Sequence, residues 1–198
     1  DIDKNQVGRQ FAQSMKMFST EVEVASEKPR HCVDILAKLG SKGTTGKSWG
    51  VNDVYEIYPG GGASKRYVRC DFETHGGPWT VVQLREPSTG TTVSFDRPIG
   101  ECMSGGFPSD QEVSGSYWIG LDHIRAMTNV NSGGTKMELR VEVCRESASD
   151  DDGPGEKCAF ASYAGFSVGA GPDYALHLDE YLGGTAGEGR LAVCLYHH

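Results

Sequence analysis

The chain has 198 residues, a length that suits one well-packed domain of mixed structure with a short additional segment. Its formal net charge is −8, so it lacks the basic field that holds a phosphate backbone, and we expect no nucleic-acid partner. No run of apolar residues approaches the ~18 needed to cross a bilayer, so no membrane span is expected. The 27 glycines, about twice the usual share, indicate a globular chain with many loops.

The first predicted element is an amphipathic helix near the N-terminus. Between residues 2 and 24, apolar side chains recur at three- and four-residue steps, which places them on one face of a helix. The stripe consists of Val7, Phe11, Met15, Phe18 and Val22. About three heptads are available, which suits either a homo-oligomer formed through residues 2–24 or docking on the chain's own domain. A charged stretch then ends in Pro-Arg, so we expect a helical and linker segment at 1–29 and one domain at 30–198.

The following elements indicate an α+β fold with a twisted, mainly antiparallel sheet. Short helices are predicted at 33–39, where Gly40 can end the helix, and at 121–127. The stretch 97–116 is rich in Gly, Pro and Ser and is expected to be irregular. β-Branched, aromatic and alternating runs predict strands at 54–58, 67–72, 79–84, 93–95, 137–143, 159–163, 166–168 and 174–178.

Two motifs resemble functional sites but lack the context that those sites need. Residues 41–48 come close to a phosphate-binding loop, yet Ser41 replaces its first Gly, and a helix precedes the motif where a strand is required. The acidic run 150–152 with Glu156 could gather around calcium, but its spacing differs from that of an EF-hand loop, and a solvated hairpin tip explains it. No spacing of Ser, His or Cys matches a known catalytic motif, so we expect no catalytic residues and no enzyme activity.

Six cysteines are scattered through the chain. None forms a Cys-x-x-Cys pair or lies beside a His at zinc-ligand spacing, so disulfides fit them better than a metal. Six cysteines allow 15 connectivities, and composition does not choose among them. They are Cys32, Cys70, Cys102, Cys144, Cys158 and Cys194.

The order of several sequence blocks resembles the fibrinogen C-terminal, or fibrinogen-related, domain family. The blocks HCVDIL (31–36) and VYEIYP (54–59) are similar to the opening of that domain. The blocks VRCDFET (68–74) and GGPWTVVQ (76–83) look like its most recognisable pair of strands. The similarity continues through 93–97, 115–121, 139–141, Tyr163, 166–169, 174–178 and 184–187. It therefore spans about residues 30–187.

The resemblance implies a Cys32–Cys70 disulfide and a secreted recognition module of the kind found in ficolins, tachylectin-like lectins, angiopoietins, tenascins and fibrinogen. In that family, an Asp-rich calcium loop, a second disulfide and an acetyl-group pocket follow the segment that corresponds to 184–187. This chain has no residues that match them. We therefore expect no calcium or other cofactor, and no ligand-binding residue can be assigned.

The remaining cysteines fall outside the family's usual pairs. Cys144 ends one strand of the predicted hairpin and Cys158 begins the next, so their α-carbons can lie within disulfide distance. By elimination Cys102 pairs with Cys194, although either could stay free or bond another chain. The leading hypothesis is a secreted, lectin-like module that recognises glycans or acetylated surface groups in innate defence. The alternatives are a structural or signalling module that binds another extracellular protein, and a truncated form without a ligand site.

Overall fold

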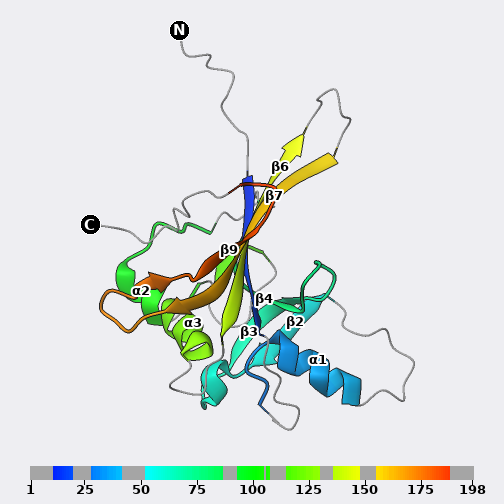
Figure 1. Cartoon of the computed structure of the whole chain (residues 1–198). Coiled ribbons are helices and arrows are strands. Elements are labelled where there is room, and N and C mark those ends of the chain that lie inside the picture. Colours follow the sequence, from blue (N-terminus) through cyan, green and yellow to red (C-terminus); the bar gives the residue numbers. More distant parts are fainter. Residues whose placement is uncertain are drawn as a thin grey trace.

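A computed structural model of the chain describes residues 11–19, 28–41, 52–86, 93–104, 106–107, 115–129, 136–147 and 155–187. These residues form a long antiparallel sheet with short helices beside it (Figure 1). The helices are α1 (Cys32–Ser41), the 3₁₀ helix η2 (Pro59–Gly61), α2 (Ile99–Ser104) and α3 (Leu121–Thr128). The strands are β1 (Phe11–Ser19), β2 (Asp53–Ile57), β3 (Arg66–Asp71), β4 (Trp79–Arg85), β5 (Tyr117–Trp118), β6 (Met137–Ser147), β7 (Gly155–Val168), β8 (Leu176–His177) and β9 (Glu180–Gly183).

The sheet is built around the N-terminal strand. Its order is β2-β3-β4-β1-β6-β7-β8, with β5 beside β4 and β9 beside β7. Strand β1 pairs antiparallel with β4 on one side and with β6 along its whole length on the other. Strands β6 and β7 form a hairpin that extends away from the helices (Figure 1). The fold class is therefore the expected α+β fold with a mainly antiparallel sheet.

The prediction of a helix through residues 2–24 is wrong for residues 11–19, which form β1. The sequence supports both structures here, because Phe11, Met15 and Phe18 follow a helical step while Met15 and Met17 alternate with polar neighbours. Tertiary pairing decides between them: a helix would leave two strand edges without backbone partners. Residues 11–19 thus belong to the same sheet as the strands that follow residue 30. The rest of the stripe lies outside the described residues.

The hydrophobic core lies between one face of the sheet and helix α3. Met17 on β1 and Leu139 on β6 stand opposite each other in register and are almost completely buried. Ile124 and Met127 of α3 and Phe166 of β7 are buried to the same degree and belong to the same cluster. These residues come from β1, β6, β7 and α3, and their packing holds α3 on the sheet.

Helix α1 is fastened to the sheet at its first turn. The Cys32 amide donates a hydrogen bond to Thr80 Oγ1 on β4 at 3.0 Å, and the Cys32–Cys70 disulfide bonds the same residue to β3. Asp34 accepts a hydrogen bond from the Arg30 amide at 2.9 Å and contacts the Arg30 side chain. The helix begins as predicted but includes Gly40 and ends at Ser41, so Gly40 does not end it.

Several other predictions differ from the structure in detail. Residues 93–95 are not a strand, because Phe95 leaves the sheet and packs edge-on against Phe107 with ring centroids 5.1 Å apart. The stretch expected to be irregular contains α2, and the predicted strand at 174–178 is reduced to β8. Strand β9 lies at the start of the Gly-rich tract and was not predicted. The hairpin, α3 and the strands corresponding to β2, β3 and β4 are confirmed.

Candidate functional site

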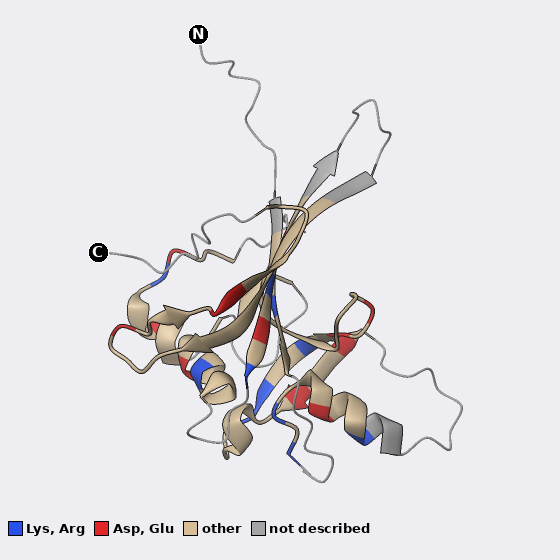
Figure 2. Cartoon of the chain, viewed as in Figure 1, with Lys and Arg blue, Asp and Glu red and all other residues tan. Residues whose placement is uncertain are grey.

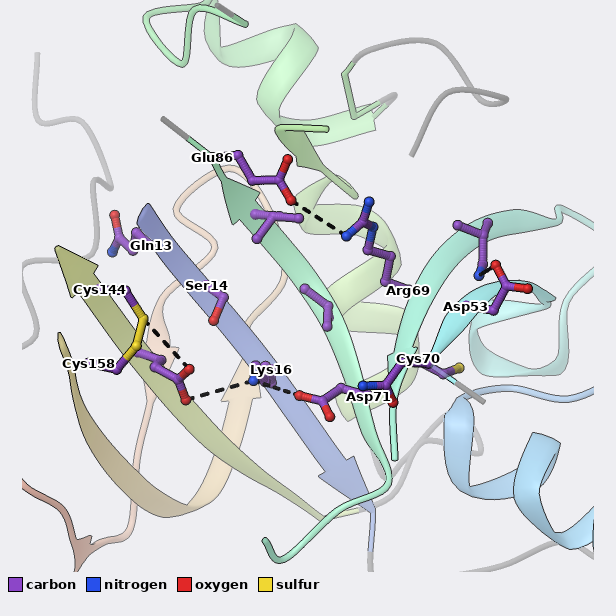
Figure 3. A pocket seen from close by; sticks show the side chains of 15 residues that line it. Gln13, Ser14, Lys16, Asp53, Arg69, Cys70, Asp71, Glu86, Cys144 and Cys158 are labelled. Carbon is purple, nitrogen blue, oxygen red and sulfur yellow. Dashed lines mark hydrogen bonds and ion pairs between the residues drawn. A yellow bond between two sulfur atoms is a disulfide. The ribbon is translucent and has the colours of Figure 1, made fainter. Parts of the chain in front are cut away.

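The sheet face opposite α3 carries a groove of about 450 Å³ (Figure 3). Its floor is β1, and β2, β3 and β4 contribute one wall while β6 and β7 contribute the other. The groove exists because β1 alternates: Met15 and Met17 enter the core, and Ser14 and Lys16 therefore point to the opposite face. It is lined by charged, polar and aliphatic side chains, and none of its lining residues is aromatic.

Lys16 is the central residue of the groove. Only 7% of its surface is exposed, which is unusual for a lysine and requires charge compensation. Its Nζ lies 2.6 Å from Asp71 Oδ2 on β3 and 3.7 Å from Glu142 Oε2 on β6. Because β4 lies between β1 and β3, the side chain reaches across a neighbouring strand to meet Asp71 (Figure 3). Lys16 therefore connects β1 with strands on both sides of it.

Asp71 is held in place by the turn that follows β3. Thr74 donates to its Oδ2 from the hydroxyl at 2.6 Å, and the amides of Glu73 and Thr74 donate to Oδ1 at 3.1 and 3.0 Å. Burial alone would raise the pKa of Asp71, but the hydrogen bonds from Lys16 and Thr74 outweigh burial and lower the pKa to about 2. The carboxylate is therefore charged and fixed at any physiological pH.

The second carboxylate of the groove is balanced by a second cation. Arg140 Nε donates to Glu142 Oε2 at 3.1 Å, and its guanidinium lies 3.5 Å from the centre of the Phe160 ring. The side chains of Arg140 and Glu142 are both mostly buried. Asp71, Lys16, Glu142 and Arg140 thus form a row of alternating charges across β3, β1 and β6. Figure 2 shows the same interspersion of signs along the strands of the sheet.

The rim of the groove is more open than its floor. Arg69 Nη1 and Glu86 Oε1 are 3.5 Å apart, and both side chains are about a third exposed. Asp53 on β2 stands at the same edge (Figure 3). The Arg69–Glu86 ion pair is exposed enough that a partner can replace it at little cost.

The structure contains the two cysteine pairs that the sequence indicates. Cys32–Cys70 has α-carbons 5.6 Å apart and is buried, whereas Cys144–Cys158 joins facing positions of β6 and β7 with α-carbons 4.0 Å apart at the groove wall. Cys102 in α2 is half-buried and has no disulfide partner among the described residues. Cys194 lies outside the described residues, so the Cys102–Cys194 pair stays a prediction.

The described residues contain one group with metal-ligand spacing, Glu142 with Cys144 and Cys158. Both sulfurs are committed to a disulfide, which removes the thiolates that a soft metal needs. The acidic run 150–152 lies outside the described residues, as do residues 42–48 of the phosphate-loop-like motif. No helix in the described part of the chain is long and apolar enough to span a bilayer.

Two histidines with strongly lowered pKa values lie away from the groove. His31, 2% exposed, has a pKa of about 4 because burial disfavours its charged form more than nearby Asp34 favours it. Burial and the Arg66 guanidinium lower the pKa of His123 to about 4, and its Nε2 accepts a hydrogen bond from Arg66 Nε at 2.6 Å. Both rings are therefore neutral at physiological pH.

Sequence reasoning did not find the groove. Its key residues come from three blocks far apart in the chain, and Lys16 lay within a segment interpreted as helical. The available signal was the alternation of Ser14, Met15, Lys16 and Met17, which places one lysine on the face opposite two methionines. Which carboxylates meet that lysine depends on strand order, and strand order is not encoded locally.

Comparison with known proteins identifies the family. The family model of the fibrinogen beta and gamma chains, C-terminal globular domain, matches residues 29–197. Bovine (Bos taurus) microfibril-associated glycoprotein 4 is 33% identical over 166 residues, which cover 81% of this chain and 54% of that protein. Mouse (Mus musculus) angiopoietin-related protein 7 is 32% identical over 77% of this chain and 39% of its own length. The chain belongs to the fibrinogen C-terminal domain family.

The solved structures agree with this assignment. The fibrinogen-like globe domain of human ANGPTL2 superimposes with a TM-score of 0.55 at 28% identity, covering 81% of this chain and 61% of that one. Among the curated sequence relatives, the fibrinogen beta chain of Gallus gallus is 28% identical over 87% of this chain and 34% of its own length. The chain thus spans between about a third and just over half of these curated relatives. The predicted family and fold are both confirmed.

Proposed function

We propose that this chain is a secreted, extracellular recognition module that binds a partner through the groove and catalyses no reaction. Two disulfides among the described residues favour an oxidising compartment. The relatives include a protein named for its association with microfibrils and the fibrinogen chains, which supports a role outside the cell. Family membership by itself does not define the ligand, because function is set by the site.

The observation that carries the choice of ligand is the row of charges that runs across β3, β1 and β6, with the open Arg69–Glu86 pair on the groove rim. A surface with alternating charges and aliphatic side chains complements a polypeptide that carries both signs. No aromatic ring lines the groove, so a sugar would find no flat apolar surface on which to stack. We therefore favour an extracellular protein as the partner. Glycans or acetylated surface groups, expected from the resemblance to lectins, are the second candidate.

The test compares two pairs of exposed residues. One variant carries Arg69→Glu with Glu86→Arg, which reverses the rim charges of the groove while keeping the net charge. The matched control carries Arg97→Glu with Glu101→Arg, an exposed pair on and before α2 that is 3.2 Å apart. Binding is measured on immobilised extracellular-matrix proteins and fibrinogen, with a glycan array that includes acetylated sugars.

Loss of protein binding in the rim variant alone would support the proposal. Equal binding by the rim variant, the control and the wild type would overturn the groove as the binding site. Binding to acetylated sugars without any protein binding would instead favour the lectin-like function.

The proposed module also works without calcium. Calcium requires six to eight oxygen ligands held together, and no described cluster supplies them. Titration calorimetry on chelator-stripped protein should show no stoichiometric isotherm with a micromolar dissociation constant. Such an isotherm would contradict this part of the proposal, and Asn substitutions at 150–152 would then show whether the acidic run forms the site.

A further inference from the structure

The central strand of the sheet comes from outside the part of the chain that matches the family. The match covers residues 29–197, which include β4 and β6, whereas β1 comprises Phe11–Ser19. Without β1, the facing edges of β4 and β6 would each expose unpaired backbone groups across a gap one strand wide. The family-matched part of this chain therefore forms an acceptor site for a strand.

Three kinds of contact bind β1 in that site. Its backbone pairs with β4 from Gln13 to Met17 and with β6 from Phe11 to Ser19. On the core face, Met15 and Met17 are 3% and 1% exposed. On the groove face, Lys16 enters a socket formed by Asp71 and Glu142, and its Nζ also donates to Thr74 Oγ1 at 3.2 Å.

The socket determines which strand fits and in which register. A shift by one residue would turn Lys16 toward the core and a methionine toward two carboxylates. An incoming strand must therefore carry a lysine between two apolar residues, as β1 does. Every group that contacts Lys16 in the socket belongs to the family-matched part, so the recognition does not require that strand and acceptor belong to the same molecule.

We propose that the site between β4 and β6 is a strand-binding site whose partner is β1 of a second copy of this chain, which exchanges with the chain's own β1. The exchanged dimer would contain the same ladders, methionine contacts and lysine socket as the monomer. The two forms then differ mainly in which copy supplies β1 and in their dependence on protein concentration. Leaving the site requires two ladders to break, so exchange should take place during refolding and be slow afterwards. This inference does not depend on the proposed function.

The test uses charge reversal in the full-length chain with its disulfides intact. A chain with Lys16→Glu presents an acidic strand to an acidic socket, and a chain with Asp71→Lys presents a basic strand to a basic residue. In an exchanged heterodimer both sockets are matched, because the Lys16→Glu strand meets the Asp71→Lys socket and the unchanged Lys16 meets the unchanged Asp71. Refolding the two chains together should therefore yield about tenfold or more dimer, measured by light scattering, than refolding either chain alone.

The control is one chain that carries both substitutions, which should match itself and refold as a monomer at low concentration. A monomeric double variant together with no heterodimer in the mixture would overturn the proposal. If the double variant fails to refold, two wild-type populations decide, one of them isotopically labelled. Dimers that contain both populations, increase with concentration and persist on dilution would support exchange. Monomers at every concentration would overturn it.

Discussion

Met17 and Lys16 are neighbours on β1 and are buried to similar extents, yet they stabilise the sheet in different ways. Met17 is 1% exposed and enters the core opposite Leu139, where dispersion and transfer from water provide the stabilisation. Lys16 is 7% exposed and enters the groove, where its charge is compensated by carboxylates from β3 and β6. The comparison shows that one strand can join an apolar core to a charged surface, and that each face should respond to a different kind of substitution.

The largest effect is expected on the core face. Leu139→Ala should lower the free energy of unfolding by about 3–5 kcal/mol, because Leu139 is fully buried and its removal leaves a cavity. Denaturation in urea measures the change. Val143→Ala on the same strand is the control, since Val143 is 40% exposed and its truncation should cost about 0.5 kcal/mol or less. Similar losses for both variants would show that β6 is not packed as described.

The two disulfides give the next comparison. Cys32–Cys70 spans 38 residues and joins α1 to β3, while Cys144–Cys158 spans 14 and joins two strands that are already paired. Chain-entropy estimates give losses of about 4 and about 3 kcal/mol when each pair is replaced by Ala. We expect a larger difference in practice, because the hairpin ladder already brings Cys144 and Cys158 together. Thermal unfolding of both double variants ranks them, and a larger loss for the hairpin pair would reverse the comparison.

On the groove face, the loss should depend on leaving a charge without a partner. Lys16→Met keeps most of the volume but leaves Asp71 without its cation, which should cost about 3 kcal/mol. Adding Asp71→Asn should recover most of this loss, since the neutral amide oxygen can still accept hydrogen bonds from the turn. Chemical denaturation of the single and double variants measures the recovery. If Lys16→Met alone and Lys16→Met with Asp71→Asn were equally stable, the Lys16–Asp71 charge pair would not be what stabilises this face.

Lowering the pH should reduce the free energy of unfolding in two separate windows, one set by the buried histidines and the other by Asp71. His31 has a folded-state pKa of about 4 against an ordinary value of 6.5, so the unfolded chain takes up the proton first. Its contribution is complete above pH 6.5 and falls by up to about 1.4 kcal/mol per pH unit as the pH decreases toward 4. His123, whose pKa is also lowered to about 4, contributes in the same direction.

Asp71, with a pKa of about 2 against 3.8, loses its contribution only as the pH falls below 3.8 and through 2. Unfolding measured at a series of pH values should show both windows. His31→Gln should weaken the dependence in the upper window and leave the lower one unchanged. A variant with the wild-type slope between pH 6.5 and 4 would rule out His31 as its source.

The smallest effect is expected at the groove rim. Arg69→Ala should change the free energy of unfolding by about 0–1 kcal/mol, because its ion pair with Glu86 is about a third exposed. Adding salt to the wild type should have an equally small effect on this pair. A loss comparable to that of Lys16→Met would mean that the rim is part of the rigid floor rather than a surface available to a partner.

Sequence alone was informative where local pattern and burial coincide. The strand around Leu139 was predicted from its alternation, the strands around Val68 and Val82 from their β-branched and aromatic runs, and the helix around Ile124 from its helical pattern. The Cys32–Cys70 pair followed from the family resemblance, and the Cys144–Cys158 pair from the hairpin. The prediction failed for residues 11–19, whose pattern fits two structures, and for Phe95, whose neighbours in space are distant in the chain.

The sequence by itself therefore determined the family, the class of fold, the acidic and disulfide-bonded character of the chain and most of its local elements, because these depend on composition and short-range periodicity. Only the tertiary structure decided that residues 11–19 are a strand, that this strand lies between β4 and β6, and that Lys16 meets Asp71 and Glu142. The physical reason is that backbone pairing and charge compensation come from partners that are brought together only when the sheet assembles.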